Sequence, residues 1–127
     1  MKRITVFILC ACSSAPPPSF GSSPIATATS SACNASIAVY AAPDPVVRGS
    51  SSIELVTSAP KSGLAISIAP FMPAMGHGSA TAPTVVDQGG GVYVASDVVM
   101  PMPGTWQLRT TIGGPCADTL VIDVDVQ

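Results

Sequence analysis

The stretch that decides the fold class is "TWQLRTTIGGPCADTLVIDVDV", residues 105–126, in which two alternating apolar segments flank a run of turn residues. The second segment places its apolar residues on one side of an extended chain and two aspartates on the other: Leu120, Ile122, Val124 and Val126, opposite Asp123 and Asp125. A period of two residues is typical of a half-buried β-strand. The stretch therefore predicts two strands joined by the turn "GGPCAD".

The same arrangement of short apolar segments and turn residues recurs through the rest of the chain. Further alternating segments lie at 34–40, 52–58, 64–70, 83–86 and 92–99, the fourth being the weakest. The runs "SAPKSG" and "DQGGG" supply turns between them. No window of useful length repeats at helical spacing. We therefore predict an all-β protein, an immunoglobulin-like β-sandwich of six or seven strands over residues 33–127.

Composition agrees with one small β domain. A chain of 127 residues has room for a single core, and its composition is 47% hydrophobic and only 9% charged. Abundant Ala, Val, Ser and Thr with little Lys and Glu favours strands over helices. If an export signal is removed, three basic residues remain against seven acidic ones, and three minus seven gives a formal charge of −4. Such a chain has no basic patch, so nucleic acid is not expected as a partner.

The N-terminus, "MKRITVFILCACSSAPPPS", has the layout of an export signal. Its apolar run, residues 4–9, is far too short to span a bilayer. The order Leu-Cys-Ala-Cys at 9–12 resembles the lipobox of bacterial lipoproteins, which implies removal of residues 1–11 and lipidation of Cys12. By the same resemblance Ser14 favours the outer membrane. The prediction is thus a lipid-anchored envelope protein facing the periplasm, and an ordinary cleaved signal would give a periplasmic or secreted one.

Residues 12–32 are Ser, Ala, Pro and Thr with almost no charge, which indicates a flexible tether. Beyond it, Cys33 and Cys116 are most simply a disulfide in an exported protein. Closing so long a loop would stabilise the domain by about 4 kcal/mol if the effect is chain entropy. A thiol metal site would need further soft or imidazole ligands, and the sequence offers none near either cysteine.

Strand directions predict which loops share an end of the sandwich. With up-and-down connections, the segments after 64–70 and after 92–99 arrive at the same end. The turn that carries Cys116 lies at the other end, together with Cys33. The first and last predicted strands, 34–40 and 119–126, would run in the same direction and could pair in parallel.

Two loops at the shared end, "FMPAMGHGSA" (71–80) and "VMPMPGTW" (99–106), contain four of the five methionines and the only histidine. A nucleophile-and-base hydrolase needs a histidine near a carboxylate, but His77 has no acidic residue within nine positions on either side. Zinc enzymes usually offer three stronger ligands. Thioethers are soft and neutral, suit Cu(I), and bind without losing a proton. The candidate copper ligands are Met72, Met75, His77, Met100 and Met102.

The alternative is that these methionines fill irregular gaps and form an apolar cap beside a surface histidine. Prolines stiffen both loops, and Gly76 and Gly78 leave the histidine sterically uncovered, which favours a metal site. Trp106 and Tyr93 are interpreted as core or rim aromatics and not as site residues.

The pair "MPAMGHGS" and "GGGVYVASDVVMPMPGTWQLRTTI" resembles the YtkA-like domain, related to the FixH family, in which a MPxMxHG loop precedes a GxYxaxxxfxMxGxWxL segment. The resemblance covers roughly residues 37–126. Met72, Met75, His77 and Met102 fall on its motif positions, and Met100 is an extra methionine. It implies an immunoglobulin-like domain linked to copper handling and to assembly of respiratory oxidases. Unlike FixH proteins, this chain has no transmembrane helix in its sequence and would be held by lipid.

These observations predict a lipid-anchored copper carrier or buffer that exchanges Cu(I) with a donor or acceptor protein of the envelope. A metal-free interaction module is the second hypothesis. An enzyme is not expected, since no reactive acid or base can be identified.

Overall fold

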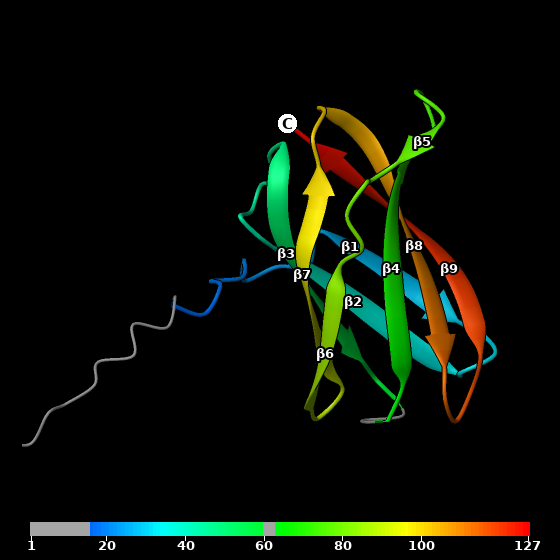
Figure 1. The fold of residues 1–127 in the computed structure, drawn as a ribbon. Helices are drawn as coiled ribbons and strands as arrows, with labels where there is room; N and C mark the ends of the chain where they lie inside the picture. The colour runs from blue at the N-terminus through cyan, green and yellow to red at the C-terminus, as the bar shows by residue number, and fades with distance from the viewer. Residues whose placement is uncertain (1–15, 60–62) are drawn as a thin grey trace, which may run out of the picture.

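The computed structural model describes residues 16–59 and 63–127, and this part of the chain forms nine β-strands and no helix (Figure 1). The predicted signal peptide, the lipobox and Cys12 lie outside the described residues. None of the described segments is a helix of the length and apolarity needed to cross a membrane.

The strands form two antiparallel sheets that pack face to face as a sandwich (Figure 1). The five-stranded sheet has the order β1 (Ala26–Ser30), β2 (Ala35–Ala42), β3 (Gly49–Thr57), β7 (Val92–Met100) and β6 (Thr84–Gly89). The four-stranded sheet has the order β5 (His77–Gly78), β4 (Ala65–Met72), β8 (Gly104–Gly113) and β9 (Asp118–Val126). All seven predicted strands are present, and the all-β sandwich is confirmed.

Strands β1 and β5 and one of the strand pairings differ from the prediction. Residues 26–30, assigned to the tether, pair with β2 from Ala26 opposite Val39 to Ser30 opposite Ala35, so the tether prediction is wrong for them. Parallel pairing of the first and last predicted strands is also wrong. Strand β2 pairs with β1 and β3, β9 pairs with β8, and all these pairings are antiparallel.

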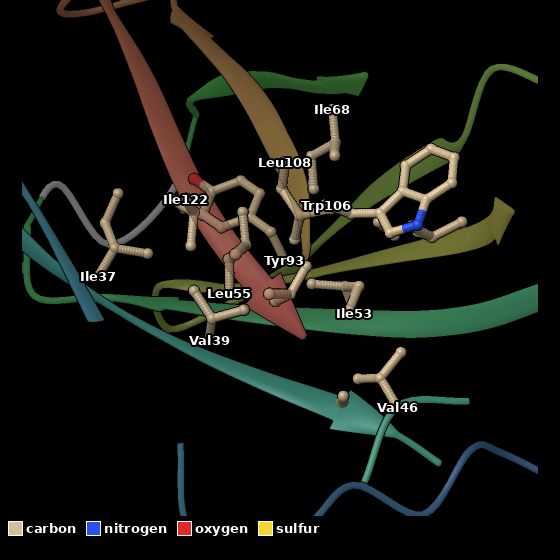
Figure 2. Packing of buried hydrophobic residues seen from close by; sticks show 14 of the residues in the cluster. Ile37, Val39, Val46, Ile53, Leu55, Ile68, Tyr93, Trp106, Leu108 and Ile122 are labelled. Atoms are coloured by element: carbon tan, nitrogen blue, oxygen red, sulfur yellow. The ribbon is translucent and has the colours of Figure 1, made fainter. Parts of the chain in front are cut away.

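The core fills the space between the sheets with the inward side chains of each strand. The largest fully buried side chains include Trp106, Tyr93, Ile37 and Leu55, each worth roughly 1.5–3 kcal/mol when removed from water. Figure 2 shows them as one continuous cluster with Ile37 at one end and Trp106 at the other. The predicted core role of Trp106 and Tyr93 is confirmed.

A bulge in β7 changes which of its side chains face the core. Up to Ala95 the odd-numbered residues are buried, but after Asp97 the buried ones are Val98 and Met100. The pairing with β3 shifts register at this point, and Asp97 has a φ of 59°. An extra residue in one strand reverses the inward and outward alternation beyond it. Met100 therefore enters the core because of the bulge.

The disulfide closes one end of the sandwich, as predicted. Cys33 lies in the β1–β2 turn and Cys116 in the β8–β9 turn, with 5.4 Å between their Cα atoms. Beside it, the Ser30 hydroxyl donates to the Asp118 carboxylate at 2.6 Å and accepts from the Cys33 N–H at 3.1 Å. The β4–β5 and β7–β8 connections lie at the opposite end (Figure 1). The methionine loops thus share an end, which confirms the strand-direction argument.

Candidate functional site

The first methionine loop is a tight hairpin between β4 and β5. Met72 ends β4 and lies directly opposite His77, the first residue of β5. The Met72 carbonyl accepts the N–H of Gly76 at 2.9 Å and that of Met75 at 3.2 Å. Gly76 adopts a φ of 65°, a left-handed conformation that glycine adopts without steric cost. The turn returns the chain so that a thioether and an imidazole become cross-strand neighbours.

Met72 and His77 share the inward face of the four-stranded sheet. Directly opposite residues of antiparallel strands project to the same side, and Met72 is only 5% exposed. Continuing the β4–β8 register by one residue sets Met72 opposite Trp106. The rings of His77 and Trp106 are 6.1 Å apart and meet edge to face at 70°. Histidine, methionine and tryptophan therefore form one row across three strands.

The second methionine loop contacts this row of His77, Met72 and Trp106 at two points. The Trp106 indole N–H donates to the Met102 carbonyl at 2.9 Å. Gly104 has a φ of 130°, and a Cβ built there would lie 2.8 Å from the Met72 methyl group. The two loops that the sequence analysis singled out are thus in contact.

The five candidate ligands differ strongly in accessibility. Met75, at the hairpin tip, is 55% exposed, and His77 is exposed as well. Met102 is half-buried against the core. Met72, opposite His77, is almost completely buried. Met100 is fully buried on β7, in the other sheet and opposite Gly49. The structure therefore places three candidates in the hairpin, brings the Met102 backbone to the Trp106 ring that His77 meets, and gives Met100 a packing role.

The imidazole of His77 is oriented by its neighbour. Its Nδ1 lies 3.2 Å from the Gly78 carbonyl oxygen, which can only accept a hydrogen bond. When Nδ1 carries the proton and donates to Gly78, Nε2 keeps its lone pair for a metal. Among residues 16–59 and 63–127, no three His, Cys, Asp or Glu side chains lie close enough together to hold an ion.

Trp106 and Gly104 are the site residues that the sequence analysis missed. Trp106 is a core residue and also touches both loops, through the His77 ring and the Met102 carbonyl. Gly104 makes the close approach to Met72 possible. A signal for both is visible in "MPMPGTW", where a glycine and a tryptophan directly follow the methionines.

The fold and this end together define a class: a small disulfide-linked β-sandwich whose methionine and histidine loops meet at the end remote from the disulfide. A family model described as YtkA-like matches residues 31–111, which include both methionine loops. The match covers more than half of the chain, and the chain belongs to the YtkA-like family. No curated protein and no solved structure matches the chain.

Proposed function

We propose that the protein is an exported, lipid-anchored carrier or buffer of copper that prefers Cu(I). One observation supports this most: the thioether of Met72 and the imidazole of His77 are cross-strand neighbours, with the Met102 loop fastened beside them. Copper is cargo here and not a catalytic cofactor. A soft, neutral donor set with one imidazole fits Cu(I) better than zinc or magnesium.

The ligands proposed to act first are the accessible ones. His77 offers Nε2, and Met75 projects from the hairpin tip. Met72 lies opposite His77, and the Met102 carbonyl is bonded to the Trp106 ring that His77 meets, so both thioethers are proposed to complete the set. Met100 is the least suited of the five, because its thioether would have to leave the packed core. A site at the surface suits ligand exchange, in which a partner with a better set of donors removes the ion.

The proposed location follows from the N-terminal sequence, of which residues 1–15 lie outside the described ones. Lipidation of Cys12, with the residues between it and Gly21 as a tether, would hold the domain at an envelope membrane, because the Gly21 N–H already donates to the Ala41 carbonyl of β2 at 3.3 Å. The partner would be a copper donor or acceptor protein in the same compartment.

The proposal is tested by Cu(I) competition titration of the oxidised full chain against a chromogenic chelator. We expect one equivalent to bind, and His77→Ala combined with Met75→Ala to weaken binding at least about tenfold, the equivalent of 1.4 kcal/mol. Val121→Ala is the matched control, since Val121 is similarly exposed but lies on β9 away from the hairpin. Absence of binding by the folded parent would refute a copper function.

A metal-free interaction module is the second candidate, favoured by the exposure of Met75 at a projecting tip. An exposed methionine is an adaptable apolar contact. This alternative predicts that copper leaves the thermal unfolding midpoint unchanged, whereas a carrier is stabilised by an ion that binds only its native state.

A further inference from the structure

The two long edges of the sandwich differ in how they are closed. On one edge β1 contacts β9, and the disulfide joins the turns that follow and precede them. The end of β9 is also bonded to a loop, since the Gln127 N–H donates to the Val46 carbonyl at 2.9 Å. On the other edge β5 covers only the last two residues of β4 (Figure 1). Most of β4 therefore pairs with no strand on that side, where β6 of the other sheet lies alongside without pairing (Figure 1).

The backbone of β4 leaves hydrogen-bonding groups unpaired along this edge. The carbonyls of Pro70 and Met72 accept from Ser79 and Gly76, on the β5 side. In an antiparallel ladder every second residue bonds to the same side. Ile66 and Ile68 have the same parity as Pro70, so their N–H and C=O groups point away from β8 and meet no partner among the described residues.

A groove of about 320 Å³ lies against this edge. One wall is β4 from Ile68 to Phe71, and the other is the connecting segment 79–83, which is rich in alanine. The lining is mainly apolar. The volume is in the range that ordinary ligand sites occupy.

Arg109 provides the only charge among the residues that line this groove. It lies on β8 directly opposite Ala69, whose small side chain leaves it uncovered. Its guanidinium stacks on Phe71 at 3.7 Å from the ring centroid and donates twice to the Gln107 side-chain oxygen, at 3.2 and 3.3 Å. No carboxylate among the described residues pairs with it. A guanidinium fixed in this way is suited to a carboxylate from another molecule.

We propose that the β4 edge binds an extended segment of a partner protein that carries a carboxylate side chain. The segment adds a strand beside β4, bonding to the backbone of Ile66 and Ile68, and sets its acidic residue against Arg109. An exposed sheet edge recognises strands through such main-chain bonds, while neighbouring pockets select the side chains. This surface requires no copper and is separate from the methionine loops.

The test uses three capped, fluorescein-labelled heptapeptides and the metal-free full chain in fluorescence anisotropy. The first alternates valine and glutamate, the second alternates valine and lysine, and the third is the first with N-methyl groups on alternate amides. We expect sub-millimolar binding of the first peptide only. Arg109→Gln should weaken it about tenfold, as loss of a charged hydrogen bond does. Arg48→Gln is the control, since Arg48 does not line the groove.

Hydrogen exchange locates the bound peptide. Saturation with the valine–glutamate peptide should slow exchange of the Ile66 and Ile68 amides and leave the Ser67 amide, which faces β8, unchanged. Equal binding of all three peptides, no effect of Arg109→Gln, or no protection at Ile66 and Ile68 would each overturn the proposal. Failure of the first peptide to bind at millimolar concentration would overturn it as well.

Discussion

The two ends of the sandwich are built on different principles. At the disulfide end a covalent bond joins the β1–β2 and β8–β9 turns, and the Ser30 hydroxyl bridges Asp118 to the backbone of Cys33. At the methionine end the loops meet through the edge-to-face contact of His77 with Trp106 and the close approach of Gly104 to Met72. The disulfide end is therefore covalently linked, whereas the methionine end exposes Met75 and His77 to solvent.

Breaking the disulfide should reduce the stability of the fold strongly. Replacing Cys33 and Cys116 by serine releases a loop of 83 residues, which costs about 4 kcal/mol if chain entropy governs the effect. Urea unfolding of the oxidised parent and the double variant measures this difference. If the ends are independent, Cu(I) affinity of the folded variant stays within about twofold of the parent, well under the tenfold change that 1.4 kcal/mol produces. A collapse of affinity in a still-folded variant would show that the ends are coupled.

The methionine end itself contains two kinds of thioether, and alanine substitutions separate them. Met100 is fully buried, so Met100→Ala should destabilise the fold by about 2–5 kcal/mol through lost burial and a cavity. Met75 is 55% exposed, so Met75→Ala should change stability by less than about 0.5 kcal/mol. Urea unfolding gives both values, with Met100→Leu as a volume-conserving control. Equal effects would contradict the distinction.

The same two methionines show what the sequence could and could not predict. The period of two residues identified the strands. Because an even number of strands separates the two methionine loops, both were predicted at one end of the sandwich, and the structure confirms this. Burial of Met100 depends on a single extra residue at Asp97. No local pattern in "VYVASDVV" shows that a bulge occurs there, or that the side chains after it change to the other face of the sheet. Short pairings such as β5 are equally invisible, because two residues carry no periodicity.

Strand β1 was predictable in principle. The segment "IATATS" alternates in the manner of a strand, but its alanines and threonines are also tether residues. Its pairing with β2, and not its composition, decides between the two. The contact of Trp106 with the methionine loops depends on the tertiary structure, and in the sequence it is visible only as the adjacent motif "MPMPGTW".

Gly104 tests how closely the two methionine loops must fit. Alanine there would place a Cβ 2.8 Å from the Met72 methyl group and force a φ of 130° on an L-residue. We expect a loss of about 1–3 kcal/mol from the strained backbone, with weaker Cu(I) binding. Gly89→Ala is the control, since Gly89 has a φ of 81° with open space around it at the far turn. Equal Cu(I) affinities of the two variants would show that copper binding does not depend on the close approach of Gly104 to Met72.

The smallest predicted effect is the acid response of the disulfide end. The Ser30 hydroxyl and then the Thr119 N–H bond the Asp118 carboxylate and hold its pKa below the ordinary 3.8. A group whose pKa is lowered on folding stabilises the native state above its unfolded pKa, and this contribution disappears as the pH falls through the folded value.

The parent should therefore lose stability below about pH 4, and Asp118→Asn should lose less over the same range. Urea midpoints measured from pH 5 to pH 2 provide the comparison. Asp87 is bonded by the Gly63 and Gly89 N–H groups and has a lowered pKa of the same sign, so its response persists in the Asp118 variant. The difference between the two curves is thus the quantity that reports on the disulfide end.

Thioethers do not titrate, so copper binding through the methionines should follow a different pH course from this loss of stability. Identical pH profiles for Asp118→Asn and the parent would show that the Ser30 bridge contributes nothing to the linked end, leaving its stability to the disulfide.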